Sequence, residues 1–216
     1  MAEQPKDRWI CLDVGETLID ETRVWTIWAD ILGITPFTFM AAMGAILARG
    51  GQFREVFGFL GRDDWEASRP RFAAAYGGFQ EGDLYPDAKP AIDSLRSHGY
   101  RVAVVANQPA ERNAELRFLG VRAEVMAMSE ELGVHKPAAE FYLEALRLMG
   151  SPDPASVAYV GDRLDNDVFP AATAGMRPVW IRRGPWAAIT SDTPPAGTLI
   201  VHSLTEMVER IGEVWA

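Results

Sequence analysis

Polar side chains follow several apolar runs of this chain, at the positions where each run ends. The runs are WICL, VAVVA and VAYVG, and the last of them leads into the acid-rich stretch GDRLDND. In addition, a lysine lies in the loop GVHKPAAEF, which precedes an expected helix. The residues concerned are Asp13, Asn107, Lys136, Asp162, Asp165 and Asp167.

A single Asp at a strand end is a common turn or cap residue, which suffices as an explanation for any one of these acids. It explains the whole set poorly, because acids brought together repel each other unless a proton or a cation lies between them. Hard cations such as Mg²⁺ prefer oxygen ligands. The set therefore predicts a magnesium site. Lysine is scarce in this chain, occurring only as Lys6, Lys89 and Lys136, so the placement of Lys136 is informative.

The elements that must position these residues alternate along the chain. Apolar, β-rich runs are expected to form strands, and the segments between them have helical patterns. This alternation predicts an α/β fold with a parallel sheet and crossover helices, in which ligands bind beyond the carboxyl ends of the strands. The expected strands are 9–12, 102–105, 125–128, 157–160 and 179–181, and the expected helices between them are 88–97, 110–119, 138–149 and 168–174.

Residues 20 to about 84 interrupt this rhythm, because they contain helical patterns and no convincing strand. We interpret them as an all-helical module inserted after the first strand. Its many aromatic residues, at helical spacing, are expected to form mainly the core of the module. The helical patterns cover 22–32, 37–48, 53–60 and 64–76.

Composition excludes some classes of function. The 216 residues carry a formal net charge of −9 with no Lys/Arg cluster, so nucleic acid is not an expected partner. No run reaches the ~18 apolar residues of a membrane span, and no membrane partner is expected. The single cysteine, Cys11, excludes an internal disulfide and favours a reducing compartment, which we interpret as the cytoplasm.

The ordered combination of Asp13 to Thr17, Asn107, Lys136 and GDRLDND resembles the four motifs of the haloacid dehalogenase (HAD) superfamily. The stretch LYPDAKPAIDSLRSHGYRVAVVANQP is similar to the segment that leads into that family's second motif. The resemblance implies a Rossmann-like core and places the helical module where the family has its C1 cap. The expected domains are therefore a core of 1–19 and 84–216 and a cap of 20–83.

The resemblance also implies a reaction, the hydrolysis of a phosphate ester on a small metabolite. Asp13 would attack phosphorus and form an aspartyl-phosphate that water then hydrolyses. Lys136 would pair with the nucleophile and the phosphoryl group, and Asn107 and Ala106 would lie at the substrate. Mg²⁺ would be held by Asp13, Asp162 and Asp167 and by the backbone carbonyl of Gly15.

Two positions depart from the family pattern. The family's phosphatases carry an acid/base Asp two residues after the nucleophile, where this chain has Gly15. Its loss is expected to cost ~10²- to 10⁴-fold in rate. The hydroxyl residue expected before Asn107 is Ala106, so backbone N–H groups would have to replace it. Glu16 is the nearest candidate for a replacement acid, and leaving groups of low pKa, as in acyl or aryl phosphates, would need little acid help.

These departures keep alternatives open. One is a degenerate member that binds a phosphorylated or acidic ligand, or a protein, without turnover. A distant alternative is a metal-independent dehalogenase, disfavoured because the acids of the last motif are present. The family's phosphonate cleavers need a cap lysine, and 20–84 contains none. The sequence leaves the substrate and the oligomeric state open.

Overall fold

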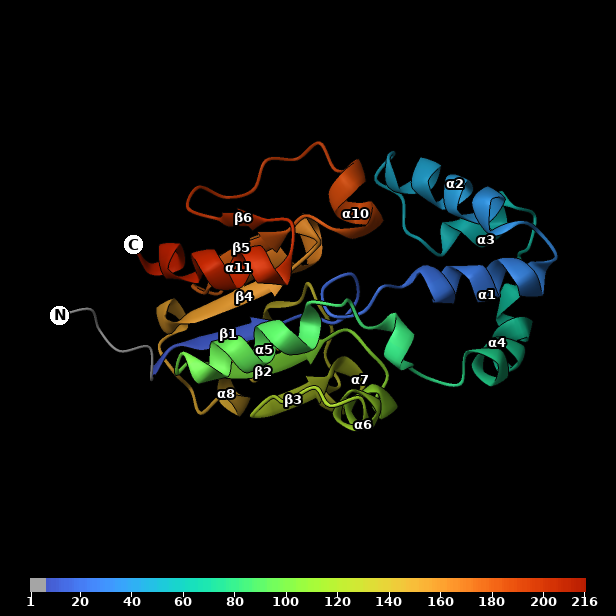
Figure 1. Cartoon of the computed structure of the whole chain (residues 1–216). Coiled ribbons are helices and arrows are strands. Elements are labelled where there is room, and N and C mark those ends of the chain that lie inside the picture. Colours follow the sequence, from blue (N-terminus) through green and yellow to red (C-terminus); the bar gives the residue numbers. More distant parts are fainter. Residues whose placement is uncertain (1–6) are drawn as a thin grey trace.

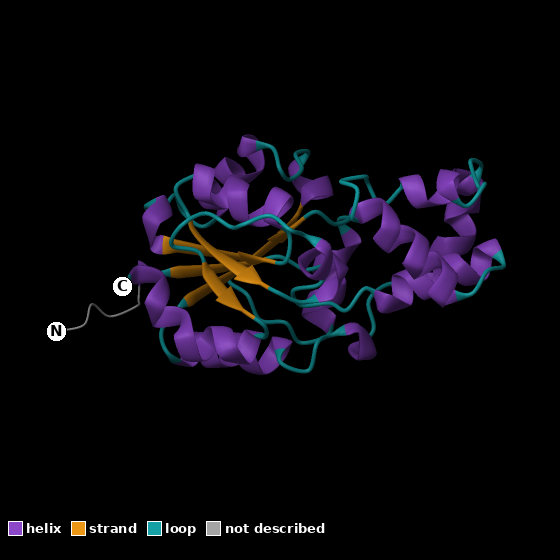
Figure 2. Ribbon diagram, turned by 90° about the horizontal axis from the view of Figure 1, so that it is seen from above, coloured by secondary structure: helices purple, strands orange, loops and turns teal. Residues whose placement is uncertain are grey.

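Six parallel strands form one sheet in the computed structural model, which describes residues 7–216. The strand order is β3-β2-β1-β4-β5-β6, and helices cover both faces of the sheet (Figure 2). The alternation of elements predicts this α/β fold with a parallel sheet, and the family resemblance implies its Rossmann-like form; the structure confirms both. The strands are β1 (Trp9–Leu12), β2 (Arg101–Ala106), β3 (Val125–Met128), β4 (Val157–Gly161), β5 (Arg177–Ile181) and β6 (Leu199–Val201).

The helices that pack on the sheet, or that lie at its carboxyl edge, follow the strands in the chain. They are α5 (Ala88–Ser97), α6 (Glu111–Phe118), α7 (Ser129–Leu132), α8 (Ala139–Leu148), α9 (Phe169–Thr173), α10 (Gly184–Ile189) and α11 (Leu204–Arg210). Five strands lie where the sequence predicts them, with ends that shift by two residues or fewer. Strand β6 was not predicted, because its three residues follow a loop rich in Pro, Gly and Thr.

The central strand β1 is buried on both faces, so its successive side chains point alternately into two different cores. Ile10 and Leu12 join one core with α5 and α11, whereas Trp9 and Cys11 join the other with α8 and α9. Complete burial of an aliphatic side chain of this kind contributes about 1.5–3 kcal/mol to the free energy of unfolding. The two cores fix the sheet, and with it the positions of the strand ends.

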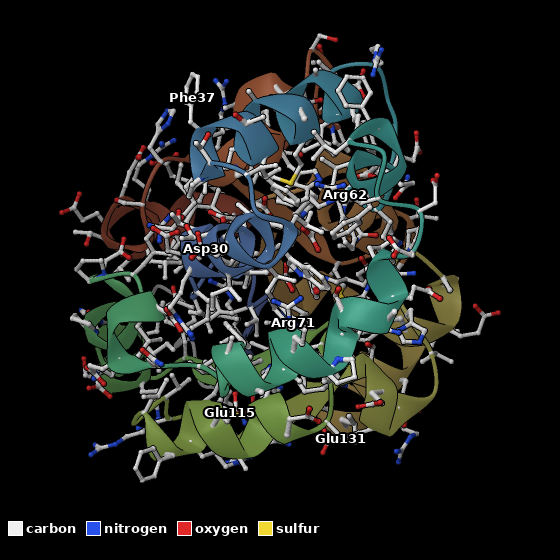
Figure 3. All side chains as sticks on the ribbon, turned by 90° about the vertical axis from the view of Figure 1, so that its right-hand side faces the viewer. Asp30, Phe37, Arg62, Arg71, Glu115 and Glu131 are labelled. Atoms are coloured by element: carbon white, nitrogen blue, oxygen red, sulfur yellow. The ribbon has the colours of Figure 1, made fainter. Side chains whose placement is uncertain are left out.

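Four helices lie between β1 and α5, on the side of the molecule toward which the carboxyl ends of the strands point (Figure 1). Their aromatic side chains pack mainly against one another, as expected; for example, the Trp28 and Phe72 rings stack with centroids 4.6 Å apart. Phe37 does not join this core: it is 83% exposed and projects outward in Figure 3. The helices are α1 (Thr22–Leu32), α2 (Pro36–Leu47), α3 (Glu55–Phe59) and α4 (Arg69–Tyr76), with a 3₁₀ turn at Trp65–Ser68.

The two chain segments that connect this helical insertion to the sheet are tied to each other. Arg23 Nε donates a hydrogen bond of 2.7 Å to Asp83 Oδ1, and the same guanidinium donates to the backbone carbonyls of Tyr76 and Gly78. A second contact joins Trp25 of α1 to Trp186 of α10, with ring centroids 6.4 Å apart. The insertion is therefore anchored at its base and also along α10.

Candidate active site

Three acids from two distant stretches of the sequence meet at the carboxyl end of the sheet. Asp13, Asp162 and Asp167 are all buried, and each offers a carboxylate oxygen that lies within 4.8 Å of the others. The strand register explains the first pair: Leu12 of β1 lies opposite Val160 of β4, so the residues that follow the two strands are neighbours. Asp13 N donates to Val160 O at 2.9 Å and fixes this alignment.

Asp167 reaches the same point through a π-helical turn over Leu164–Val168. The turn folds the chain back over the end of β4, and Arg163 N donates to Asp167 Oδ2 at 3.0 Å. Gly161 makes this return physically feasible, because a Cβ there would lie 2.5 Å from Asp167 Oδ2. The glycine in GDRLDND thus leaves room for the last acid of the motif.

Lys136 supplies the positive charge of the site. Its Nζ lies 2.7 Å from Asp13 Oδ1 and 2.6 Å from Asp167 Oδ1, and the residue is buried. Burial alone would lower the pKa of Lys136, but the Asp13 and Asp167 carboxylates outweigh it and raise the pKa above its usual value. The side chain is therefore a fixed ammonium placed between two acids.

Asn107 holds the loop that carries Lys136. Its Nδ2 donates to Lys136 O at 3.0 Å, and its Oδ1 accepts from Lys136 N at 2.8 Å. Both ends of the amide therefore bind the backbone of one residue. This geometry orients Lys136 toward the acids and joins the end of β2 to the loop before α8.

With all three acids ionised, the charges of this cluster do not balance without a further cation. Three carboxylates and one ammonium leave two negative charges in excess, and Asp162 Oδ2 is buried with no hydrogen-bond partner among residues 7–216. Burial and the neighbouring Asp167 and Asp13 raise the pKa of Asp162 well above its usual range. Burial, only partly offset by Lys136, also raises the pKa of Asp167, to about 6. An all-oxygen donor set of this charge fits a hard divalent cation such as Mg²⁺.

The remaining residues that the sequence singled out lie around this cluster. Ala106 is fully buried in the sheet core and presents no polar side chain. Glu16 is buried, and its two oxygens accept hydrogen bonds from Tyr85 Oη at 2.6 Å and from Glu21 N at 3.1 Å. Asp165 is exposed and pairs with Arg163, so it does not join the acids.

Comparisons with known proteins identify the family of this chain. The family model of haloacid dehalogenase-like hydrolases matches residues 8–175. The chain belongs to this family. Its phosphatases generally use Mg²⁺, and the family's chemistry is hydrolysis.

Relatives of this HAD-family chain include named phosphatases. It is 41% identical to the glyceraldehyde 3-phosphate phosphatase of Methanopyrus kandleri, over 46% of this chain and 44% of the relative. It is 29% identical to the phosphoserine phosphatase of Thermus thermophilus, over 73% of this chain and 68% of the relative. The first match thus spans less than half the length of that relative.

A solved structure shows the same fold along nearly the whole chain. A predicted phosphoglycolate phosphatase from Haemophilus somnus superposes with a TM-score of 0.71, at 20% identity, covering 95% of this chain and 98% of that one. At this identity the likeness shows the fold alone.

Sequence reasoning missed one acid that lies beside Gly15, Glu21. A Cβ at Gly15 would lie 2.7 Å from Glu21 Oε1, so this carboxylate occupies the space beside the glycine. Burial, followed by the charges of Glu16 and Asp13, raises the pKa of Glu21 to about 8. In the sequence Glu21 is an acid at the start of a helix, where the helix dipole is explanation enough. No local signal distinguishes it from such a residue.

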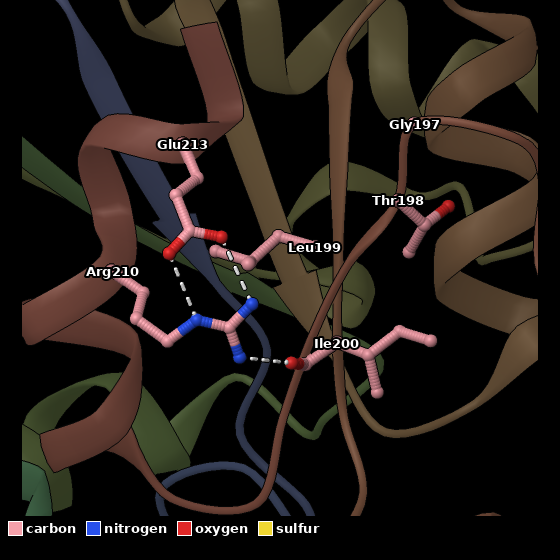
Figure 4. Close-up of a pocket in the computed structure, with 6 residues that line it drawn as sticks. All are labelled: Gly197, Thr198, Leu199, Ile200, Arg210 and Glu213. Atoms are coloured by element: carbon pink, nitrogen blue, oxygen red, sulfur yellow. Dashed lines mark hydrogen bonds and ion pairs between the residues drawn. The ribbon is translucent and has the colours of Figure 1, made fainter. Parts of the chain in front are cut away.

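Two further features lie outside the acid cluster. A surface hollow beside the edge strand β6 is lined by Thr198, Leu199 and Ile200, with the Arg210–Glu213 pair at its rim (Figure 4). None of the clustered acids lines it. Among residues 7–216, no single helix is long and apolar enough to span a membrane; the α1–α2 pair, bent by 112°, reaches that length and composition only together.

Proposed function

We propose that this chain is a Mg²⁺-dependent phosphohydrolase that acts on a small phosphorylated metabolite through an aspartyl-phosphate on Asp13. The observation that carries the proposal is the buried cluster of Asp13, Asp162 and Asp167 with Lys136 in contact with two of them. Membership of the family and the phosphatase names of its relatives support the same reaction.

The residues of the chain have separate roles in this reaction. In the first step an Asp13 carboxylate oxygen bonds to phosphorus as the bond to the leaving oxygen breaks. In the second step water attacks the phosphorus and Asp13 regains its carboxylate. The Lys136 ammonium, fixed 2.7 Å from Asp13, orients the nucleophile and attracts the phosphoryl oxygens. Asn107 positions Lys136 through the two backbone hydrogen bonds described above.

Asp13, Asp162 and Asp167 would hold the cation, with the Gly15 carbonyl as a further ligand. When bound, Mg²⁺ neutralises the negative charge that otherwise repels an approaching phosphate. Ala106 lies at the end of β2 and can offer the substrate only its backbone. Both carboxylate oxygens of Glu16 accept hydrogen bonds. Glu16 is therefore better suited to stabilising the turn before α1 than to transferring protons.

The helical insertion, residues 20–83, is proposed to act as a C1 cap over the core of 1–19 and 84–216. Two observations support this role. The insertion lies on the side of the strand ends that carry the acids, and Arg23 and Asp83 tie its two connections together. A cap in this position would choose the substrate, and the names of the relatives suggest triose and amino-acid phosphates as first candidates. We further propose a cytoplasmic location, which the single free cysteine, Cys11, supports.

The direct experiment measures phosphate release from p-nitrophenyl phosphate, glyceraldehyde 3-phosphate and phosphoserine, with Mg²⁺ and with EDTA. We expect turnover that requires Mg²⁺ and that disappears in Asp13→Asn. The matched control is Asp165→Asn, which changes an exposed acid of the same motif and should keep near wild-type activity. Full activity in Asp13→Asn would refute the proposal.

A second candidate function is binding of a phosphorylated or acidic ligand without turnover. Gly15 and Ala106 favour it, because each lacks a side-chain group that the family's phosphatases use. Calorimetry that shows binding with Mg²⁺ present, without product after days, would support this alternative. A metal-independent dehalogenase is disfavoured, because an acid cluster with excess negative charge would repel a haloacid carboxylate. Release of halide that continues in the presence of a chelator would support the dehalogenase instead.

A further inference from the structure

The space beside Gly15 is filled by another part of the chain. A Cβ at this position would lie 2.7 Å from Glu21 Oε1 and 3.1 Å from Glu21 Cδ. The backbone of Gly15 is not in the left-handed region, so its conformation alone does not call for glycine. The Glu21 carboxylate fills the space that a side chain at position 15 would take, so such a side chain would have to displace it. The other carboxylate oxygen, Glu21 Oε2, lies 3.7 Å from that Cβ position.

No structural task accounts for the Glu21 carboxylate. It makes no hydrogen bond or ion pair with any residue in 7–216, and the residue as a whole is half-buried. Glu21 is the residue before α1, but Asp20 Oδ1 caps the helix by accepting from Thr22 N at 2.8 Å. The backbone of Glu21 is itself fixed, because its N–H donates to Glu16 Oε1 at 3.1 Å.

We propose that Glu21 is the general acid and base of this site, working from the space that an aspartate at position 15 would otherwise occupy. The inference rests on the proposed phosphohydrolase function and deepens it. Glu16 then has a positioning role, since it holds the Glu21 backbone in place. Because Glu21 lies at the entrance to the helical insertion, the proton-transfer group and the cap belong to one segment.

The proton balance has two steps. As Asp13 bonds to phosphorus, the phosphorus–oxygen bond to the leaving group breaks and its electron pair stays on the leaving oxygen. The Glu21 carboxyl gives its proton to this oxygen, which departs as an alcohol. The resulting Glu21 carboxylate then takes a proton from the attacking water, phosphate leaves as the bond to Asp13 breaks, and Glu21 is protonated again.

The test exploits the fact that acid catalysis matters most when the leaving group is basic. In Glu21→Gln we expect kcat/KM for an alkyl phosphate such as glyceraldehyde 3-phosphate to fall roughly 10²- to 10⁴-fold. For p-nitrophenyl phosphate, whose leaving group is weakly basic, kcat/KM should change less than about fivefold. Because the base is also missing, one equivalent of p-nitrophenol should appear in a burst, with phosphate retained on Asp13 and detected by mass spectrometry.

Glu66→Gln is the matched control, since Glu66 is an exposed acid of the same insertion and should leave both substrates unaffected. Circular dichroism and thermal unfolding verify that each variant folds. An unchanged alkyl phosphatase activity in Glu21→Gln, or an equal loss on both substrates without a burst, would overturn the role of Glu21. A wild-type chain inactive on every phosphate ester would instead refute the proposed function, so the two failures are distinguishable.

An exchange of the two positions provides a second test. Gly15→Asp alone should impair activity, because the new side chain meets Glu21. The double variant Gly15→Asp/Glu21→Ala should regain much of the alkyl phosphatase activity that Glu21→Ala loses. If the double variant is no more active than Glu21→Ala, an acid at position 15 cannot replace Glu21 in proton transfer. That result would contradict the claim that the two acids occupy the same space and have the same role.

Discussion

Replacing Asp162 by Asn should change the stability of this protein in opposite directions with and without Mg²⁺. Asp162 is 3% exposed, its Oδ2 has no hydrogen-bond partner in the part of the chain that the structure describes, and the Asp13 and Asp167 carboxylates offer oxygens within 4.8 Å. At that separation and an effective dielectric constant of ~20, each repulsive pair costs about 3 kcal/mol. The Lys136 ammonium offsets part of this cost.

In EDTA at pH 8, Asp162→Asn should therefore raise the free energy of unfolding by ~1–3 kcal/mol. With free Mg²⁺ at about 1,000 times its Kd, the wild type should gain about 4 kcal/mol, and the variant much less. The order of the two stabilities then reverses. Urea unfolding followed by tryptophan fluorescence measures both, and a change of ~1 kcal/mol corresponds to roughly 2–4 °C in Tm for a chain of this size.

The pH dependence gives a second measurement on the same variant. The pKa of Asp162 is raised in the folded state by burial and by Asp167 and Asp13. Between the unfolded and folded pKa values the folded chain holds a proton that the unfolded chain has lost, so this group makes the wild type less stable as pH rises. The advantage of the variant in EDTA should accordingly grow from pH 5 to pH 8.

Asp165→Asn is the control, because its carboxylate is exposed and pairs with Arg163. It should respond to Mg²⁺ as the wild type does. A variant at Asp162 that is less stable than the wild type in EDTA, or that gains as much from Mg²⁺, would refute the reasoning that these acids hold the cation.

Two other substitutions probe the frame around the site. Gly161→Ala should displace Asp167, lower phosphatase activity and destabilise the fold by ~1–3 kcal/mol. Gly212→Ala, whose Cβ position has no described atom within 4 Å, should have none of these effects. Equal unfolding curves for the two variants would contradict this prediction. Asp87→Asn should cost ~2–3 kcal/mol in urea unfolding, because it weakens the ion pair with Arg183 and the hydrogen bond from Leu204 N, yet the stabilisation by Mg²⁺ should persist. A lost Mg²⁺ response would show that this distant pair also shapes the metal site.

Local patterns were sufficient for most of the fold. Runs such as Trp9–Leu12 and Val125–Met128 are apolar throughout because both faces of a parallel sheet are covered, and they form strands with the expected ends. Strand β6 escaped detection because three residues carry too little periodicity, and it exists only by pairing with β5.

The sequence by itself also determined which polar residues meet. Asp13 and Asp162 follow neighbouring strands whose parallel register forces them together, and Lys136 joins them as the motif order suggested. The position of the last acid of GDRLDND was decided by the π-helical turn over Leu164–Val168, which turns Asp167 inward and leaves Asp165 in solvent, and Gly161 leaves room for it.

Only the tertiary structure decided what lies beside Gly15. The sequence shows that an acid is missing there and offered Glu16 as the nearest substitute, yet the Glu16 oxygens are occupied by Tyr85 and by the backbone of Glu21. Glu21 enters the space instead. Which side chain fills a gap depends on the path of the backbone between β1 and α1, and on partners such as Tyr85 that are distant in sequence. Spacing and periodicity contain no information about such a path, because they describe one element at a time.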